Sequence, residues 1–301
     1  MNKSPKTRGS LYRDHTIAAW IMLAPTVIGM VIFTFGAMIY SFYLGFTNYS
    51  LINIPKFIGF ANYSRVLTSD IFQKSLVNVT YYVILSIPTS IAMALLIAML
   101  MNMKIKGITL FRTIYFTPAV ASTVVVAMIW GTVLNYRYGI LNRLLSLIGV
   151  APVDWLNTPQ WTMPALALVA IWSGIGGNII IYLAGLKGIP RTLYEAAIID
   201  GAGSWAAFRH ITIPMMTPTI FFSLTLGLIG GFQLFELPYV LTKGGPQYAT
   251  ITPVYQIYES GFTYFEMGRA SAMAWIVFAV ILVVTAINLR LSNRWVFYAG
   301  R

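Results

Sequence analysis

Residues 75–103 read SLVNVTYYVILSIPTSIAMALLIAMLMNM, a run without a single Lys, Arg, Asp or Glu. A helix that crosses the hydrocarbon core of a bilayer needs about 20 consecutive, largely apolar residues. Because lipid offers no hydrogen-bond partner to an open strand, a helix is the economical conformation for such a run. The sequence therefore predicts a transmembrane helix here, near residues 76–101.

Five further windows without a charged residue lie on either side of this run. They are His15–Pro55, Thr113–Tyr136, Trp155–Leu186, His210–Phe235 and Ala270–Leu289. A charge at the centre of a spanning helix costs roughly 2.5–3.5 kcal/mol, so windows of this length are typical of spans. Trimmed of their turn-like ends, the six windows predict spans near 17–46, 76–101, 114–134, 162–186, 214–235 and 270–289. The expected fold is an all-α membrane protein with six transmembrane helices, forming one domain over residues 16–301 after a tail over residues 1–15.

The composition excludes an ordinary soluble domain. The 301-residue chain is 58% hydrophobic and 9% charged, whereas soluble domains carry roughly 25% charged residues. A net charge of +12 is also found in nucleic-acid-binding proteins. Here the positive charges stand in short segments between apolar runs, so no nucleic-acid partner is expected. The chain has no cysteine, which excludes disulfides, thiolate metal sites and cysteine nucleophiles, and its two histidines predict no metal or catalytic site.

The basic residues predict the orientation of the spans. Thirteen lie on the side of the N-terminus and seven on the other side. Because positive charge favours the cytoplasm, both termini and the segment between the fourth and fifth spans are expected there. The basic N-terminus runs into an apolar stretch far longer than the roughly 7–15-residue core of a signal peptide, so we interpret it as a retained first span.

The segment between the fourth and fifth spans, residues 188–218, reads GIPRTLYEAAIIDGAGSWAAFRHITIPMMTP. Pro190 suits a first helical turn, which predicts a short helix over Arg191–Ile199. Glycines at positions 201 and 203 end that helix, and Ser204 is placed to cap a second one over Trp205–His210. The segment is more apolar than a solvated loop, which indicates a protein interface. The alternative is a loop that folds back on its own bundle.

This segment resembles the EAA loop of permeases from binding-protein-dependent ABC importers. The matching residues are Glu195, Ala196 and Ala197, then Gly201, then the end Ile211-Thr212-Ile213-Pro214. Ile213 stands where Leu is usual, which is a conservative departure. The stretches Leu241–Pro246 (LTKGGP) and Gly268–Ala272 (GRASA) are similar to the carbohydrate branch of the family, with its MetI-like transmembrane fold. The resemblance covers roughly residues 70–290, with a core at about 72–290, and it is nearer to MalF-type than to MalG-type permeases.

The resemblance implies a cytoplasmic coupling helix that is seated in a cleft of an ATPase subunit. Its implied coupling residues are Glu195, Ala196, Ala197, Asp200, Gly201 and Pro214. The implied partners are an ABC ATPase dimer, a second permease subunit (a heterodimer being favoured), an extracytoplasmic solute-binding protein and the lipid of a prokaryotic cell membrane. No cofactor or catalytic residue is implied, and the chain has no GxxxxGK[ST] nucleotide loop.

The resemblance also implies a substrate path on the middle spans. Polar and glycine residues cluster in Trp172–Asn178 (WSGIGGN) and Gly230–Glu236 (GGFQLFE). The candidates are Gly174, Gly177, Asn178, Gly231, Gln233 and Leu234. Aromatic stacking and neutral hydrogen bonds suit a sugar or oligosaccharide. The alternative is close packing of small residues together with one interhelical hydrogen bond.

Three rival functions are open to the sequence. An ion-coupled secondary transporter usually needs charged groups near the midplane, and the charge-free windows argue against it. A membrane-embedded enzyme would need a metal cluster, paired carboxylates or a nucleophile with its base, and no such constellation stands out. The same import machinery could carry glycerol phosphate, which would favour basic groups in the path, and none is visible there.

Overall fold

The computed structural model describes residues 8–103 and 107–297, and these form helices with a single isolated β-bridge, between Thr47 and Phe57. The α-helices are α1 (Arg8–Gly29), α2 (Ala37–Gly45), α3 (Ala61–Leu67), α4 (Asp70–Asn102), α5 (Ile108–Val120), α6 (Thr123–Val133), α7 (Ile140–Leu147), α8 (Pro159–Lys187), α9 (Arg191–Ile199), α10 (Ser204–Ala207), α11 (Ile213–Phe232), α12 (Glu236–Leu241), α13 (Pro253–Tyr258) and α14 (Met267–Trp295). Three π-helical segments are η1 (Met30–Gly36), η2 (Phe208–Thr212) and η3 (Glu259–Thr263). The all-helical expectation is confirmed.

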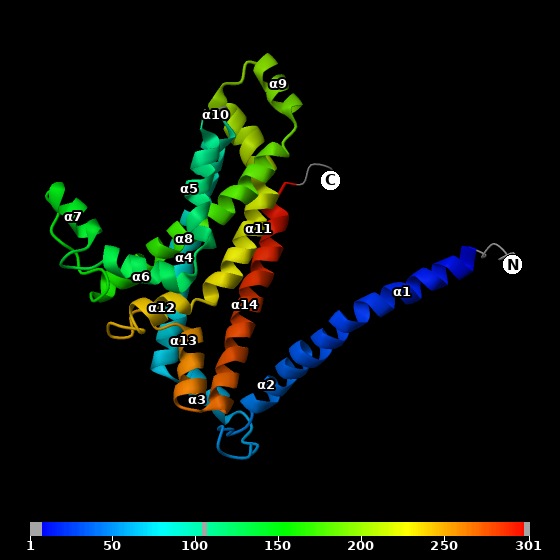
Figure 1. Cartoon of the computed structure of the whole chain (residues 1–301), viewed down its shortest axis with the longest axis vertical. Helices are drawn as coiled ribbons and strands as arrows, with labels where there is room; N and C mark the ends of the chain where they lie inside the picture. Colours follow the sequence, from blue (N-terminus) through cyan, green and yellow to red (C-terminus); the bar gives the residue numbers. More distant parts are fainter. Residues whose placement is uncertain (1–7, 104–106, 298–301) are drawn as a thin grey trace.

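Five stretches of helix are long and apolar enough to cross a membrane. They are Thr16–Gly45, Asp70–Asn102, Pro159–Lys187, Ser204–Phe232 and Met267–Trp295. Each coincides with a span predicted from the charge-free windows. The last four form the upright bundle of α4, α8, α11 and α14, with α5 beside it (Figure 1). The chain is therefore a multi-pass membrane-embedded protein.

The third predicted span, near 114–134, is broken rather than straight. Thr113–Val120 and Thr123–Val133 meet at a bend of 110°. Ala121 and Ser122 are extended between the two helices, so the ladder of backbone hydrogen bonds is interrupted there. After the bend α6 packs against α12 and α8, which carries it away from the axis of α5.

The core lies along the contact between α4 and α8. In one half of the bundle it comprises Ala94, Ala98, Ile179 and Tyr182 with Met216 of α11. In the other half, residues of α4 and α8 pack with α6, α12 and the end of α11. Small side chains on α4 let α8 approach closely, because their Cβ groups leave room for the larger residues opposite.

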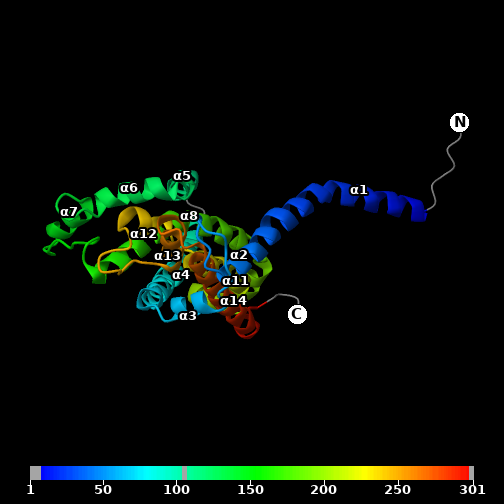
Figure 2. The same ribbon diagram turned by 90° about the horizontal axis from the view of Figure 1, so that it is seen from below.

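The first span projects from the bundle as one long helix made of α1, η1 and α2 (Figures 1 and 2). None of its most apolar window is buried by the rest of the chain. It is joined to the bundle at its end, where the rings of Phe42 and Trp275 lie 4.8 Å apart. Asn62 of α3 donates hydrogen bonds to the carbonyls of Gly45 and Thr47 at 3.0 and 2.8 Å.

The helix α1 begins at Arg8, inside the stretch predicted as a tail over residues 1–15. Residues 1–7 lie outside the part of the chain that the structure describes.

Candidate functional site

A helical projection, which we call the knob, joins α8 to α11 and comprises α9, α10 and η2 (Figure 1). Its first helix ends in a glycine-dependent turn. The N–H of Ala202 donates to the carbonyl of Ala197 at 2.8 Å, and the N–H of Gly201 donates to that of Ile198 at 3.0 Å. This is a Schellman ending, which needs a left-handed residue after the helix. Gly201 supplies it with a φ of +77°.

The outer surface of the knob is apolar and uncovered. Ile198, Ile199 and Trp205 are 72%, 86% and 71% exposed. No residue of α9 is buried, although Tyr194 packs against the core of the bundle, so most of the knob surface is left uncovered. Glu195 is exposed on the same helix, and Asp200 is exposed at its C-cap. A helix that leaves large apolar side chains in water beside charged ones is typical of a protein interface.

The knob is rigidly connected to the bundle. The hydroxyls of Tyr194 in α9 and Thr212 in η2 are hydrogen-bonded at 2.9 Å. The helix is continuous from Ser204 through Pro214 to Phe232. A proline lacks the N–H that would bond to the previous turn, and the π-helical segment η2 just before it accommodates the change. A displacement of α10 is therefore passed directly to α11.

The glycines of α8 divide between two faces. A side chain added at Gly174 or Gly177 would meet no atom of this chain within 4 Å. One added at Gly176 would collide with the backbone carbonyl of Tyr115, because α5 crosses α8 there. Asn178 is part-buried and donates to the hydroxyl of Ser90 in α4 at 3.3 Å. The open face of α8 therefore carries the first two candidates, with Asn178 held beside it.

The candidates at the end of α11 also divide. Gly231 is buried, and a side chain added to it would press on Val83 of α4. Leu234 is buried in the core shared with α6 and α12. Gln233 is exposed at the point where α11 ends. Of the three, Gln233 alone presents its side chain outward.

The comparisons with known proteins place these features in one family. Residues 72–296 match the family model described as "Binding-protein-dependent transport system inner membrane component". The chain belongs to this family. It is 34% identical to the arabinooligosaccharides transport system permease protein AraP of Bacillus subtilis, over 94% of this chain and 91% of that protein. It is 34% identical to the probable ABC transporter permease protein YesP of the same organism, over 96% and 94%.

A solved structure has the same fold. It is the bacterial ABC transporter involved in the import of the acidic polysaccharide alginate, with a TM-score of 0.83, 28% identity, and coverage of 94% of this chain and 98% of that one. The proteins that match are permease components of transporters, so the permease is not itself an enzyme.

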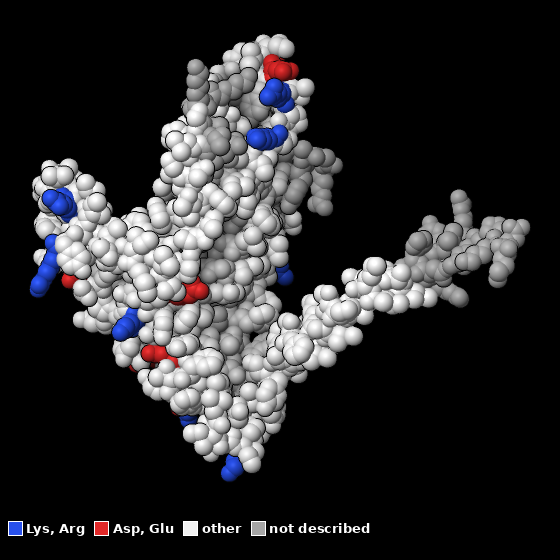
Figure 3. Space-filling model, viewed as in Figure 1, with Lys and Arg blue, Asp and Glu red and all other residues white. Residues whose placement is uncertain are grey.

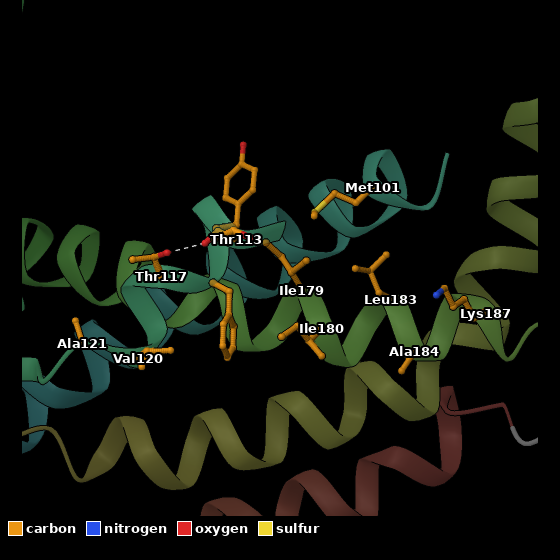
Figure 4. A pocket seen from close by; sticks show the side chains of 13 residues that line it. Met101, Thr113, Thr117, Val120, Ala121, Ile179, Ile180, Leu183, Ala184 and Lys187 are labelled. Carbon is orange, nitrogen blue, oxygen red and sulfur yellow. Dashed lines mark hydrogen bonds between the residues drawn. The ribbon is translucent and has the colours of Figure 1, made fainter. Parts of the chain in front are cut away.

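The permease contains a cavity of about 840 Å³ between α5 and α8, with Met101 of α4 at its edge (Figure 4). Ile179, Ile180, Leu183 and Ala184 line it from α8. Lys187 lies at one end. A sugar would leave most of its hydroxyls unpaired against this lining, at a penalty for each. Although this cavity is large, its mostly apolar lining does not suit a sugar.

A smaller cavity of about 250 Å³ lies between α4, α8 and α11. It is lined by Ser90, Asn178 and Ser223 among aliphatic residues. The hydroxyl of Ser223 is buried in this lining. Sequence reasoning missed both serines. The sequence signal for them is a serine inside a charge-free run. This signal is weak, because serine hydroxyls in helices usually bond to a carbonyl of their own helix.

An aromatic contact was also missed. The rings of Trp130 in α6 and Trp172 in α8 pack edge to face at 5.6 Å. Trp172 is exposed and stands one helical turn before Gly176, on the face of α8 that α5 crosses rather than on the face of Gly174 and Gly177. The bent third span thus brings a second indole against Trp172, a contact that a straight helix over 114–134 would not predict.

Proposed function

We propose that this chain is a pore-forming subunit of an ATP-driven importer for a sugar or oligosaccharide, delivered by an extracytoplasmic solute-binding protein. Family membership supports import with a binding protein, and a structure of the related alginate importer is in complex with its alginate pentasaccharide-bound periplasmic protein. The substrate class is supported by relatives named for arabinooligosaccharides, trehalose/maltose and lactose. The observation that carries the proposal is the exposed knob, continuous with a spanning helix.

In this proposal the knob is the docking point for the ATPase. Glu195 makes a charged contact, while Ala196 and Ala197 allow close approach of the ATPase surface. Gly201, followed along the chain by Pro214, fixes the angle between the knob and α11. When ATP closes the ATPase dimer, α10 moves with it. Since the helix runs unbroken from Ser204 to Phe232, α11 must move too.

Asp200 joins the same docking surface. It is exposed at the end of α9, directly before the Gly201 turn. Its carboxylate and that of Glu195 give the knob a polar rim around the apolar Ile198 and Ile199. A polar rim around an apolar centre is the usual anatomy of a protein interface.

The substrate path runs along the open face of α8 and the end of α11. Gly174 and Gly177 leave room for a ligand, and Asn178 offers both a donor and an acceptor. Gln233 reaches outward from the end of α11. Gly231 and Leu234 contribute indirectly, because they hold the end of α11 against α4 and the core.

A second permease subunit covers the first span. The helix over Thr16–Gly45 has no buried residue in its most apolar window, so it needs either lipid or another protein on every side. We favour a heterodimer. The knob faces the cytoplasm, and both termini lie on that side of a prokaryotic cell membrane, in keeping with the thirteen basic residues there.

Two experiments test the proposal. Proteoliposomes holding the complete transporter should take up an oligosaccharide only with internal ATP and external binding protein, and uptake should resist a proton ionophore. Because the chain has no cysteine, Glu195→Cys gives a single labelling site. An impermeant maleimide should label it in inverted vesicles and not in intact cells. Labelling from outside, or uptake that depends on the proton gradient, would refute the proposal.

A further inference from the structure

Five aromatic rings gather at α12, α13 and η3, a group we call the tyrosine cluster: Phe235, Tyr239, Tyr255, Tyr258 and Phe262. Phe235 and Tyr239 lie 5.2 Å apart between ring centroids, and Tyr239 and Tyr258 lie 5.3 Å apart. Phe262 continues the row at 5.5 Å from Tyr258. Tyr255 is buried beneath it, whereas Tyr239 and Phe262 are exposed. The cluster is therefore a fixed aromatic surface with a buried base.

Polar groups border these rings. A hydrogen bond with Tyr239 raises the pKa of the Tyr258 phenol. Burial, and after it the charge of Glu259, raises the pKa of Tyr255. Burial also raises the pKa of the Glu259 carboxyl, so this group is partly withdrawn from water beside the rings. Hydroxyls and a carboxyl thus share one surface with the aromatic faces.

The cluster lies in the half of the bundle farther from the knob, with α13 below α12 (Figure 1). It leads directly into α14 at Met267. The other end of α14 is near the start of α11, where the N–H of Phe297 donates to the hydroxyl of Thr217 at 2.8 Å. Since α11 starts at the knob, the start of α14 is remote from it (Figure 1). With the knob facing the cytoplasm, the cluster faces the side from which substrate arrives.

Few charges interrupt this face of the bundle, and those present include acidic groups near the short helices (Figure 3). A belt of interfacial aromatics would also place tyrosines near the ends of spans. In such a belt the rings stand on the spanning helices at the level of the lipid headgroups. Here they touch one another at two short helices and a π-helical segment that follow the spanning helix Ser204–Phe232, and the Glu259 carboxyl belongs to the same π-helical segment.

We propose that the tyrosine cluster is a sugar-binding subsite at the outer mouth of the permease, suited to a neutral oligosaccharide rather than a uronate. The inference rests on the proposed sugar import. A sugar ring has an apolar C–H face, which packs on an aromatic ring, and hydroxyl edges, which bond to phenols and a carboxylate. The Glu259 carboxylate accepts hydrogen bonds from neutral sugars and repels the carboxylate of a uronate. The cluster thus receives the sugar before it reaches the path along α8.

Saturation-transfer difference NMR on the complete transporter in nanodiscs tests this, with maltotriose, arabinotriose and an alginate trisaccharide as probes. We expect signal from at least one neutral trisaccharide and little from the alginate probe. Tyr239→Leu should raise the Kd of the neutral probe, taken from a titration of the signal, at least tenfold, which corresponds to about 1.4 kcal/mol of binding energy. Tyr239→Phe retains the ring and should retain most of the signal. Glu259→Gln should raise the signal of the alginate probe.

The matched control is Tyr138→Leu, an exposed tyrosine between α6 and α7 that no ring of the cluster contacts. Equal signals from Tyr239→Leu and Tyr138→Leu would overturn the subsite, as would no signal from either neutral probe on the unmodified transporter. Loss of binding-protein capture with an unchanged trisaccharide signal would instead make the cluster a docking surface. Uptake by the unmodified transporter tests the import function separately. If the transporter takes up sugar but Tyr239→Leu and Tyr138→Leu give equal NMR signals, the subsite is refuted and sugar import is not. Uptake of glycerol phosphate alone would refute sugar import.

Discussion

Replacing Gly201 by serine tests whether the shape of the knob transmits force to the spans. Gly201 has a φ of +77°, and a side chain added there would meet nothing within 4 Å. Its replacement therefore produces backbone strain without a collision. The left-handed conformation costs a residue with a Cβ roughly 1–2 kcal/mol. A change of that size alters an equilibrium by a factor of about 5–30.

The same substitution at Gly203 provides a matched control. Gly203 is two residues away, has a φ of −74° and a ψ of 168°, and is equally open. It stands at the N-cap of α10, where serine is among the preferred residues. Gly203→Ser should therefore leave the knob intact or stabilise it, although both variants add the same atoms to the same loop.

The measurement is the affinity of the cognate ATPase subunit for the permease in nanodiscs, together with ATP-driven uptake. Gly201→Ser should weaken ATPase binding about 5- to 30-fold and reduce uptake, while Gly203→Ser should match the unmodified chain. If both variants bind the ATPase equally well, the Schellman turn does not set the docking geometry. The coupling role of the knob would then need another basis.

Three further predictions concern the spans. Asn178→Ala removes the hydrogen bond to Ser90 and should impair uptake with unchanged ATPase affinity; equal uptake across a substrate titration would remove Asn178 from the path. Gly176→Ala should lower unfolding stability by about 1–3 kcal/mol, because its Cβ overlaps the Tyr115 carbonyl; an unchanged melting temperature in detergent would contradict this. Asn62→Ala removes the donor to the carbonyls of Gly45 and Thr47, which should loosen the attachment of the first span to α3 and speed protease cleavage between them. Unchanged cleavage would show that these two hydrogen bonds are dispensable.

The sequence predicted five of the spans well, because the free-energy penalty of a charge in lipid acts residue by residue. The helix edges were less accurate. The second span was expected near 76–101, and the helix runs from Asp70 to Asn102. A helix continues beyond the hydrocarbon core into water, where Asp70 and Lys74 are tolerated. Absence of charge therefore locates the lipid-embedded part rather than the whole helix.

The bend in the third span could not be predicted from its proline. Pro118 precedes the break by three residues, but Pro88 and Pro218 lie inside continuous helices of the same bundle. The difference lies in the packing of the helix after the break. α6 turns toward α12, and their contact belongs to a core cluster that also includes residues of α8. Such tertiary contacts join residues more than a hundred positions apart, which local sequence does not encode.

The glycines of the fourth span show what remained undetermined at the candidate site. On a helix, residues three apart share a face, so Gly174 and Gly177 belong together and Gly176 points elsewhere. The sequence contains this division but not which face is packed. The structure assigns the packed face to Gly176, against α5, and leaves the other two open. Packing and transport are therefore separable on one helix turn. A bulky residue at Gly174 should obstruct the path without loosening the bundle, whereas the smallest side chain at Gly176 should loosen the bundle even where the path is clear.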